Sequence, residues 1–593
     1  MSVSRRTVLV GGSLAAAAVA GLQPTPAHAA RNEQRWITAT IGAMTPEQKI
    51  GQLFVQEVYG STPDTADARN LPQYGVETPR EVVETLHLGG VIYFAWTDSY
   101  VNPEQVATLS NGLQEAALSA KGGAPLFIAT DQEQGVVTRF GPPATQFPGS
   151  MALGAGRSAT DARTAAAITG QELRAVGINV DFAPVSDVNV NAENPVIGVR
   201  AFSSDPTLTA ELVAAQVDGY QVDGQVCSST KHFPGHGDTA TDSHTGLPVI
   251  THSREEWERI DAPPFIAAME RGVDMVMTAH LLVPALDDSD DPATLSHTIM
   301  TGILRDELGY DGVLITDGLM MAAIREKYGD AEVAVRALEA GVDQLLMAPK
   351  PLEARDAIMD ALRSGRLRWR DIDAKLRRIL RAKYRRGIVA RPLADLTKIN
   401  SIVGTDEHEA AAAYITDHTV TLIKNDAGTL PLSVAGTSVL VTGYGVSTTR
   451  SVADELIARG ATTTVLQTGT RPTEAQIAEV VSAAGSHDTV VVLTNKAWDT
   501  KVTDPEAGQQ RLVTELHASG ATLVVVAVRD PYDINTFDEI DTYVATYSYS
   551  PVAPPALVRM LTGEVPPIGK LPVDIPVSGS TGVLYSFGHG LGY

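Results

Sequence analysis

Eight short apolar segments alternate with helix-like stretches across the first two thirds of the chain. Each has the length and composition of a buried strand, and nearly all the stretches between them are rich in Ala or Glu. The segments lie at residues 52–58, 90–95, 126–131, 180–185, 226–230, 275–280, 313–317 and 344–347. Eight strands in alternation with helices favour a closed barrel over an open doubly wound sheet. We therefore predict an α/β fold with a (β/α)8 TIM barrel over residues 31–390.

A second α/β block follows the barrel. Residues 391–410 mix Pro, Gly and charged residues without clear periodicity, which predicts a linker. Beyond it, further strand-like segments lie at 420–424, 438–442, 463–467, 489–494, 522–528 and 542–547, with helices between most of them. This pattern predicts a smaller α/β (αβα) sandwich domain over residues 411–593. Its Gly443-Tyr444-Gly445 lacks the third glycine of a dinucleotide fingerprint, so we expect no nucleotide site there.

The first thirty residues have the pattern of an export signal. Arg5 and Arg6 precede an apolar run at 8–22, and Ala27-His28-Ala29 has the small-x-small pattern of a cleavage site. Residues 1–30 are therefore predicted to be a twin-arginine (Tat) signal peptide of a secreted protein. Glycines interrupt the apolar run, which favours cleavage over a retained membrane anchor. The single cysteine, Cys227, allows no intramolecular disulfide and is expected to be a buried core thiol.

The charge balance narrows the classes of partner. The chain has 46 Lys and Arg against 70 Asp and Glu, a net charge of −24, which disfavours nucleic acid and anionic membranes as partners. Residues 363–386 are a local exception, because eleven of them are Lys or Arg. Apolar residues at helical spacing lie between these charges, so we expect a structural helix with a solvated or interdomain basic face.

The segment KHFPGHGDTATDSHTGLP at 231–248 contains histidines, acids and a lysine, and its Pro and Gly residues exclude a helix interior. It follows the apolar run at 225–230, so its polar groups lie at the end of a predicted strand. The carboxyl ends of barrel strands are where such folds place their active sites. A polar, well-solvated loop without a catalytic role is the alternative.

Asp317 closes another predicted strand, in GVLITDGLMM, and Gly318 after it leaves the carboxylate exposed at the mouth of the barrel. A carboxylate in this position can attack an anomeric carbon and form a glycosyl ester that water then resolves. An N-cap of the following helix is the structural alternative.

Asp242-Ser243-His244 forms a second candidate group. The Asp242 carboxylate can accept a hydrogen bond from one ring nitrogen of His244, which leaves the other nitrogen to protonate a leaving oxygen. Lys231 and His232 suit hydrogen bonding to sugar hydroxyls. A metal site built from His232, His236 and His244 is disfavoured, because Pro234 and Gly235 exclude the helical spacing of metalloprotease ligands.

These motifs resemble those of the bacterial β-N-acetylglucosaminidases of glycoside hydrolase family 3, of the NagZ type in a two-domain secreted form. The resemblance rests on KHFPGHGDTATDSHTGLP and ITDGLMM, on ATDQEQG, on NPVIGVRAFSSDP at 194–206, and on TLIKNDAGTLPL and IGKLPVDIP in the second block. It covers essentially the whole chain after the predicted signal. The motifs in the barrel are highly specific, whereas those in the second block mark only the wider family.

The resemblance implies a retaining exo-β-N-acetylglucosaminidase that acts on a carbohydrate partner. We further expect no metal or other cofactor and a monomer, although the sequence itself does not fix the oligomeric state. Asp317 would be the nucleophile, and His244 with Asp242 the mobile acid/base dyad. Five residues match positions that hold the sugar in the minus-one pocket: Asp131, Arg139, Arg200, Lys231 and His232. The second domain would contribute no catalytic residue. Gln134 replaces a glycine that is usual in the family, so we expect the loop that carries Asp131 to be reshaped.

Three alternatives remain open. An imidazole acid does not repel phosphate, so the enzyme could be a β-N-acetylglucosaminide phosphorylase. A β-glucosidase of the same family is a second alternative, although those enzymes take their acid from the second domain. A cell-wall-binding protein without activity is the third, and the intact set of Asp317, His244, Asp242 and Lys231 argues against it.

Overall fold

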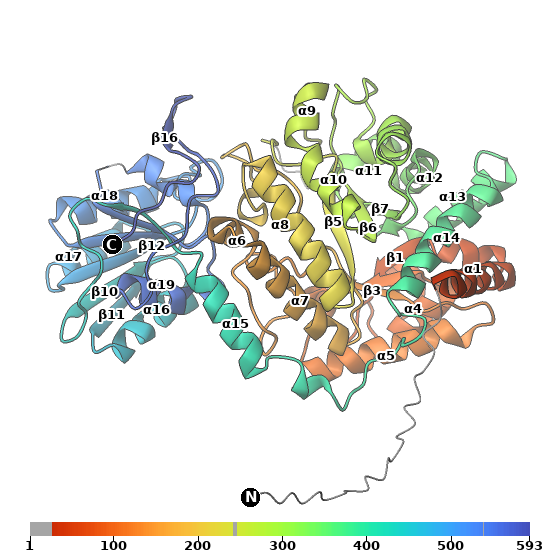
Figure 1. Ribbon diagram of the computed structural model, residues 1–593, viewed down its shortest axis with the longest axis horizontal. Coiled ribbons are helices and arrows are strands. Elements are labelled where there is room, and N and C mark those ends of the chain that lie inside the picture. The colour runs from red at the N-terminus through yellow and green to blue at the C-terminus, as the bar shows by residue number, and fades with distance from the viewer. Residues whose placement is uncertain (1–25, 241–245, 538) are drawn as a thin grey trace, which may run out of the picture.

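The computed structural model describes residues 26–240, 246–537 and 539–593, and it contains two α/β units (Figure 1). The first runs from red to green in the figure and the second is blue. All eight predicted barrel strands are present. They are β1 Phe54–Glu57, β2 Gly90–Ile92, β3 Phe127–Thr130, β4 Val180–Asp181, β5 Cys227–Phe233, β6 Met275–Thr278, β7 Val313–Ile315 and β8 Leu345–Leu346.

The strands form one parallel sheet in the order β7-β6-β5-β4-β3-β2-β1-β8. A parallel bridge between Ile315 and Gln344 brings β7 back to β8. The predicted (β/α)8 barrel is therefore confirmed. Every strand residue is buried, since helices cover the outside and packed side chains fill the inside.

Several predicted strand ends differ from the observed ones: β2, β4, β6 and β7 end two to four residues earlier than predicted, whereas β5 is longer. β5 continues to Phe233, three residues past the predicted end at residue 230, so Lys231 and His232 belong to the strand and not to the following loop. The neighbouring segment supplies the backbone partners that extend it. Ser186 N–H donates to the Lys231 carbonyl at 2.6 Å, and Lys231 N–H donates to the Pro184 carbonyl at 3.2 Å.

Helices surround the barrel. They are α1 Pro26–Ala43, α2 Pro46–Gly51, α3 Leu71–Tyr74, α4 Pro79–Leu86, η1 Ala95–Thr97, α5 Pro103–Ser119, α6 Ser150–Gly156, α7 Ala159–Ala175, η2 Gly198–Arg200, α8 Pro206–Asp218, η3 Gly219–Asp223, α9 Arg254–Ile260, α10 Ala262–Glu270, η4 Ala293–Leu295, η5 Thr298–Glu307, α11 Ala322–Tyr328, α12 Asp330–Ala340, α13 Pro351–Arg363 and α14 Trp369–Arg385. Helix starts follow capping chemistry. At α4, Thr78 accepts from Glu81 N–H, the Glu81 side chain accepts from Thr78 N–H, and Pro79 fills the first helical position.

The basic segment folds as predicted into helix α14, but its basic residues are not simply solvated. Lys383 is fully buried and donates to Gln52 Oε1 (3.1 Å) and to the Gly89 carbonyl (2.8 Å), just before β1 and β2. Burial lowers its pKa to about 7. Lys375 donates to the Val342 carbonyl before β8. The helix therefore lies against the amino-terminal ends of the barrel strands. Acceptor groups just before these strands bind its two buried lysines.

The second domain contains the six predicted strands. They are β9 Thr421–Asn425, β10 Ser438–Gly443, β11 Thr462–Gln467, β12 Thr489–Thr494, β13 Leu523–Ala527 and β14 Thr542–Ala545, in the order β11-β10-β12-β13-β14-β9 with β9 antiparallel. A hairpin of β15 Ile575–Pro576 and β16 Val583–Tyr585 was not predicted. The helices are η6 Ile399–Ser401, α15 Asp406–Asp417, α16 Val446–Ala458, α17 Glu474–Ala484, α18 Gly508–Ala518, η7 Pro531–Thr536 and α19 Ala553–Leu561. Helix α15, which begins inside the predicted linker, lies between the barrel and the second domain (Figure 1).

The two domains share apolar packing. Met151, Ala152 and Ala155 of α6 and Val199 of η2 join the core of the second domain. Asn189 also donates to the Tyr532 hydroxyl across the interface at 3.1 Å. The part of the barrel that carries Arg200 therefore rests on the second domain.

Within the described residues, no helix has both the length and the apolar character that a membrane span requires. The apolar run at 8–22 and the twin arginines lie outside those residues.

Candidate active site

A cavity of about 580 Å³ opens at the carboxyl end of the barrel. It is lined by six of the predicted site residues, which come from four different strand ends and loops: Asp131, Arg139, Arg200, Lys231, His232 and Asp317. The other two, Asp242 and His244, lie outside the described residues. Every described residue that lines this cavity belongs to the barrel. The strand-end rule thus predicted the place of Asp131, Lys231, His232 and Asp317, whereas Arg139 and Arg200 were expected here from the resemblance alone.

Asp317 lies two residues beyond β7 and opens onto this cavity. Its Oδ1 accepts a hydrogen bond of 2.7 Å from the Gly318 backbone N–H. Enclosure by protein opposes ionisation, but His232, His280 and the Gly318 N–H outweigh it and hold the pKa below its usual value. The carboxylate is therefore ionised at neutral pH, as a nucleophile must be.

Lys231 connects two carboxylates beside Asp317. Its Nζ lies 2.7 Å from Asp131 Oδ1 and 2.7 Å from Glu133 Oε1. Burial alone would lower the pKa of Lys231, but the two carboxylates raise it. Arg200 binds the same Glu133 through two hydrogen bonds of 2.8 Å. Two cations and two anions therefore form a neutral, buried network that fixes the Asp131 and Arg200 side chains at the cavity.

Glu133 is a site residue that sequence reasoning did not single out. It lies in the ATDQEQG motif only two residues after Asp131, and its side chain is 2% exposed. Burial would raise its pKa, but Arg200 and Lys231 hold it far below the usual range. The sequence does contain a signal for Glu133: it is the second acid of the motif, and a spacing of two residues places Asp131 and Glu133 on the same side of an extended chain.

His232 is oriented by a carboxylate that was also missed. Its Nδ1 donates to Asp187 Oδ2 at 2.7 Å, and the His232 backbone N–H donates to Asp187 Oδ1 at 3.2 Å. The other ring nitrogen, Nε2, lies 3.4 Å from Arg200 Nη2 and faces the cavity. Asp187 follows the fourth predicted strand, so the strand-end rule would have found it.

Arg139 lies between Asp131 and two aromatic rings. Its Nη2 is 4.0 Å from Asp131 Oδ2, and its guanidinium carbon is 5.4 Å from the centroids of both Phe94 and Trp96. Its buried Nε has no hydrogen-bond partner among the described residues. The guanidinium is thus held by weak contacts and can reorient toward a polar ligand.

Gln134 takes the backbone conformation that the glycine usual at its position adopts easily, with a φ of 69°. Its side chain is buried and turned away from the cavity. The Nε2 donates to Thr169 Oγ1 of α7 at 3.0 Å, and the Oε1 accepts from Phe147 N–H at 3.1 Å. These two bonds offset part of the strain of a non-glycine residue in this region.

Asp181, at the end of β4, lies below this network. Its Oδ1 accepts from Gln132 N–H at 2.9 Å, whereas its buried Oδ2 has no hydrogen-bond partner within the described part of the chain. Complete burial raises its pKa to about 8. The carboxyl group is therefore protonated at neutral pH.

The histidines that could have formed a metal site have other roles where they are described. His236 Nδ1 lies 2.9 Å from Thr239 Oγ1, and burial lowers the pKa of His236 to about 4. Within the described ranges, no group of three or more His, Cys, Asp or Glu could hold a metal ion. Cys227 is buried in β5, as predicted.

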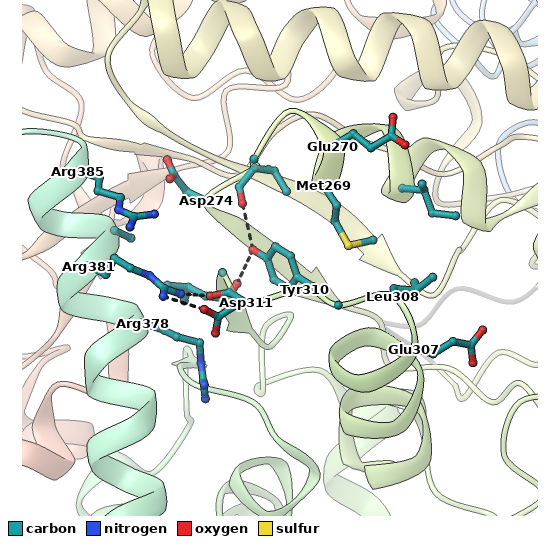
Figure 2. A pocket seen from close by; sticks show the side chains of 17 residues that line it. Met269, Glu270, Asp274, Glu307, Leu308, Tyr310, Asp311, Arg378, Arg381 and Arg385 are labelled. Carbon is teal, nitrogen blue, oxygen red and sulfur yellow. Dashed lines mark hydrogen bonds and ion pairs between the residues drawn. The ribbon is translucent and has the colours of Figure 1, made fainter. Parts of the chain in front are cut away.

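A second cavity, of about 560 Å³, lies at the opposite end of the barrel (Figure 2). It is lined by residues that precede β6 and β7 and by arginines of α14, which approach from one side in the figure. Those arginines are already paired: Arg378 with Asp343 and Arg381 with Asp311, each through charged hydrogen bonds. Barrel enzymes keep their chemistry at the carboxyl ends, so we assign the candidate site to the first cavity.

Comparisons with known proteins agree with the fold and the motifs. The Glycosyl hydrolase family 3 N terminal domain matches residues 45–382, and the corresponding C-terminal domain matches residues 420–593. The structure of a glycoside hydrolase family 3 beta-N-acetylglucosaminidase from Paenibacillus sp. str. FPU-7 superposes with a TM-score of 0.82. It is 38% identical to this chain, and the match covers 90% of this chain and all of that one.

Two curated relatives differ in how much of the chain they cover. Beta-hexosaminidase A of Pseudoalteromonas piscicida is 40% identical over 381 residues, which are 59% of this chain and 62% of the relative's length. Beta-N-acetylglucosaminidase/beta-glucosidase of Cellulomonas fimi is 27% identical over 563 residues, which are 91% of this chain and 95% of that protein.

Proposed function

The chain belongs to glycosyl hydrolase family 3, and from that premise we propose that it is a secreted, retaining exo-β-N-acetylglucosaminidase. It would release terminal N-acetylglucosamine from β-linked glycans, such as cell-wall muropeptides or chitin fragments. The names of the Paenibacillus and Pseudoalteromonas relatives support N-acetylhexosamine as the sugar.

The observation that carries the proposal is the ionised Asp317 at the cavity, beside the neutral network of Asp131, Glu133, Lys231 and Arg200. The network places charged hydrogen-bonding groups around a terminal sugar, and Asp317 attacks its anomeric carbon. A glycosyl ester forms as the leaving-group oxygen departs with a proton. Water then attacks the ester, and the product keeps the β configuration.

Asp242 and His244 complete this proposal as the acid/base dyad. The His244 imidazole would give its proton to the leaving oxygen and then take one from the attacking water, while Asp242 accepts a hydrogen bond from its other nitrogen. The described lining of the cavity is drawn wholly from the barrel, which favours an acid from a barrel loop over one from the second domain.

The substrate test compares two aryl glycosides with the same leaving group. We expect kcat/KM for the N-acetylglucosaminide to exceed that for the glucoside at least tenfold. A preference for the glucoside would favour the β-glucosidase alternative instead. Turnover of neither aryl glycoside would favour a cell-wall-binding protein.

Phosphorolysis is tested on the same enzyme. Products are compared with and without added inorganic phosphate, and free N-acetylglucosamine is expected in both. Sugar 1-phosphate as the dominant product would make phosphate, and not water, the natural acceptor.

Export through the twin-arginine route is a separate part of the proposal. Changing both Arg5 and Arg6 to Lys should leave unprocessed protein inside the cell, because that route reads the arginine pair. Normal secretion of the double variant would refute it.

A further inference from the structure

A large aromatic side chain lies exposed at the rim of the candidate site. Trp96 of η1 is 49% exposed and lines the same cavity as Asp317. Its ring stacks on that of Phe94, which is only 4% exposed, with centroids 3.9 Å apart and planes 13° apart. One face of the indole is thus covered by a buried ring.

The position of Arg139 shows that it does not cover the other face. Its guanidinium carbon is equally far, 5.4 Å, from the two ring centroids. A group above the outer face of Trp96 would be much closer to Trp96 than to Phe94, because the rings are stacked. Arg139 therefore lies beside the stack, along the ring edges, and does not cover the outer face of the indole, in agreement with the 49% exposure of Trp96.

Trp96 is also held in place before any ligand binds. Its Nε1 donates to Glu57 Oε2 at 3.3 Å, and its carbonyl accepts from Arg69 Nη1 at 2.8 Å. A fixed aromatic surface loses little conformational entropy when a ligand stacks on it. The exposed indole is therefore a preformed platform.

We propose that Trp96, supported by Phe94, binds the sugar ring on the leaving-group side of the scissile bond. This inference rests on the proposed function. Asp131, Lys231 and Arg200 supply charged groups for the terminal sugar, and Arg139 lies between Asp131 and the aromatic stack. Trp96 is thus placed where the rest of the substrate leaves the polar pocket. The C–H face of a pyranose packs against an aromatic ring, so the substrate class is a β-linked oligosaccharide of N-acetylhexosamine, not a small aglycone.

The test compares two substrates that differ only on the leaving-group side. N,N′-diacetylchitobiose has a sugar there, whereas β-N-acetylglucosaminyl fluoride has a single atom. We expect Trp96→Ala to lower the ratio of kcat/KM for the disaccharide to that for the fluoride roughly three- to tenfold, the range of an aromatic stacking contact. Trp96→Phe keeps a ring but loses the hydrogen bond to Glu57, and its ratio should stay within about twofold of wild type.

Trp369→Ala is the matched control. Trp369 is a partly exposed tryptophan on α14, at the other end of the barrel, and its loss should leave the ratio at the wild-type value. An unchanged ratio in Trp96→Ala would overturn the platform. A ratio in Trp96→Phe as low as in Trp96→Ala would also overturn it, because the hydrogen bond and not the stacking surface would then be responsible.

A binding measurement separates this inference from the proposed function. Calorimetry with diacetylchitobiose and the Asp317→Asn protein needs no turnover, and adding Trp96→Ala should raise Kd roughly three- to tenfold. Wild-type protein that cleaves neither substrate would overturn the hydrolase, while a Trp96-dependent Kd would still support the platform. No binding, or a Kd that Trp96→Ala does not change, would overturn the platform.

Discussion

Glu133→Gln is the substitution that most strongly tests the charge network at the cavity. Glu133 accepts from Lys231 at 2.7 Å and from Arg200 through two bonds of 2.8 Å, and its side chain is 2% exposed. Gln has the same shape but no charge. In the variant, the two cations Lys231 and Arg200 therefore keep only one carboxylate of the network, that of Asp131.

The expected cost follows from these contacts. Each close pair contributes about 4 kcal/mol at an effective dielectric constant of about 20. Removing the carboxylate also removes its own desolvation penalty, which offsets part of the loss. Breaking a buried pair by removing one partner typically costs about 3–5 kcal/mol, and we expect that value for the free energy of unfolding of the barrel. The kcat/KM should fall as well, since Lys231 and Arg200 lose the carboxylate that positions them.

Urea unfolding of wild type and variant measures this loss. Because two domains need not unfold together, amide exchange in β3 and β5 should be followed as a separate report on the barrel. Glu57→Gln is the matched control. Glu57 is a buried carboxylate that accepts from Tyr59 and Trp96 and has no ion pair among the described residues, so its loss should cost only about 1 kcal/mol.

The depressed pKa of Glu133 determines how its contribution to the free energy of unfolding depends on pH. The folded-state pKa of Glu133 is depressed, so its stabilisation is complete above the unfolded pKa, about 4.3, and is lost only below it. The difference between wild type and variant should therefore stay constant from about pH 6 to 8. A loss below about 1 kcal/mol at pH 7, or no larger than in Glu57→Gln, would refute the network as described.

Three further predictions concern other groups of the site. Asp181→Asn should become more stable relative to wild type by up to about 1.4 kcal/mol per pH unit as pH rises from about 4 to 8. The reason is that the folded wild type keeps a proton on Asp181 that the unfolded chain releases. Parallel curves of unfolding free energy against pH for the two proteins would contradict this. Gly198→Ala puts a Cβ 3.1 Å from Asp530 Oδ1 at a φ of 46°, so it should displace Arg200 and lower kcat/KM about tenfold. Gly75→Ala is the control, because its φ of 72° is also positive but the space around it is open, and it should leave kcat/KM unchanged. Equal effects of the two variants would show that backbone strain alone is responsible. His244→Ala should steepen the dependence of log kcat/KM on leaving-group pKa, because poor leaving groups need the proton in the transition state, and an unchanged slope would exclude His244 as the acid.

Most of the fold could be predicted because its signals are local. Strands such as β7 are short apolar runs that end at turn residues and are followed by helical stretches, and sequence shows both features. Asp317 was placed correctly for the same reason, since a strand end in a parallel barrel always points its polar residue to one rim. Gln134 was harder, because only the folded chain shows that its side chain turns to Thr169.

The features that sequence reasoning missed depend on long-range contacts. β5 extends to Phe233 because two distant segments supply hydrogen-bond partners. Pro184 and Ser186, about 45 residues earlier in the chain, bond Lys231, and the Ala279 N–H after β6 donates to the Phe233 carbonyl. The charges of α14 looked solvated, but Lys383 is buried against Gln52 and Gly89, which periodicity cannot show. Trp96 was likewise unremarkable in sequence, and only its stacking on Phe94 and the place of Arg139 give it a role.

Identification of the covalent intermediate tests the central claim most directly. The enzyme is mixed with an activated fluoro-sugar of N-acetylglucosamine, which slows breakdown of a glycosyl ester, then quenched in acid, digested and mapped by mass spectrometry. We predict that the peptide with GVLITDGLMM gains the mass of one sugar and that fragmentation places it on Asp317. A label on another carboxylate, or no label with a product of inverted configuration, would contradict Asp317 as the nucleophile.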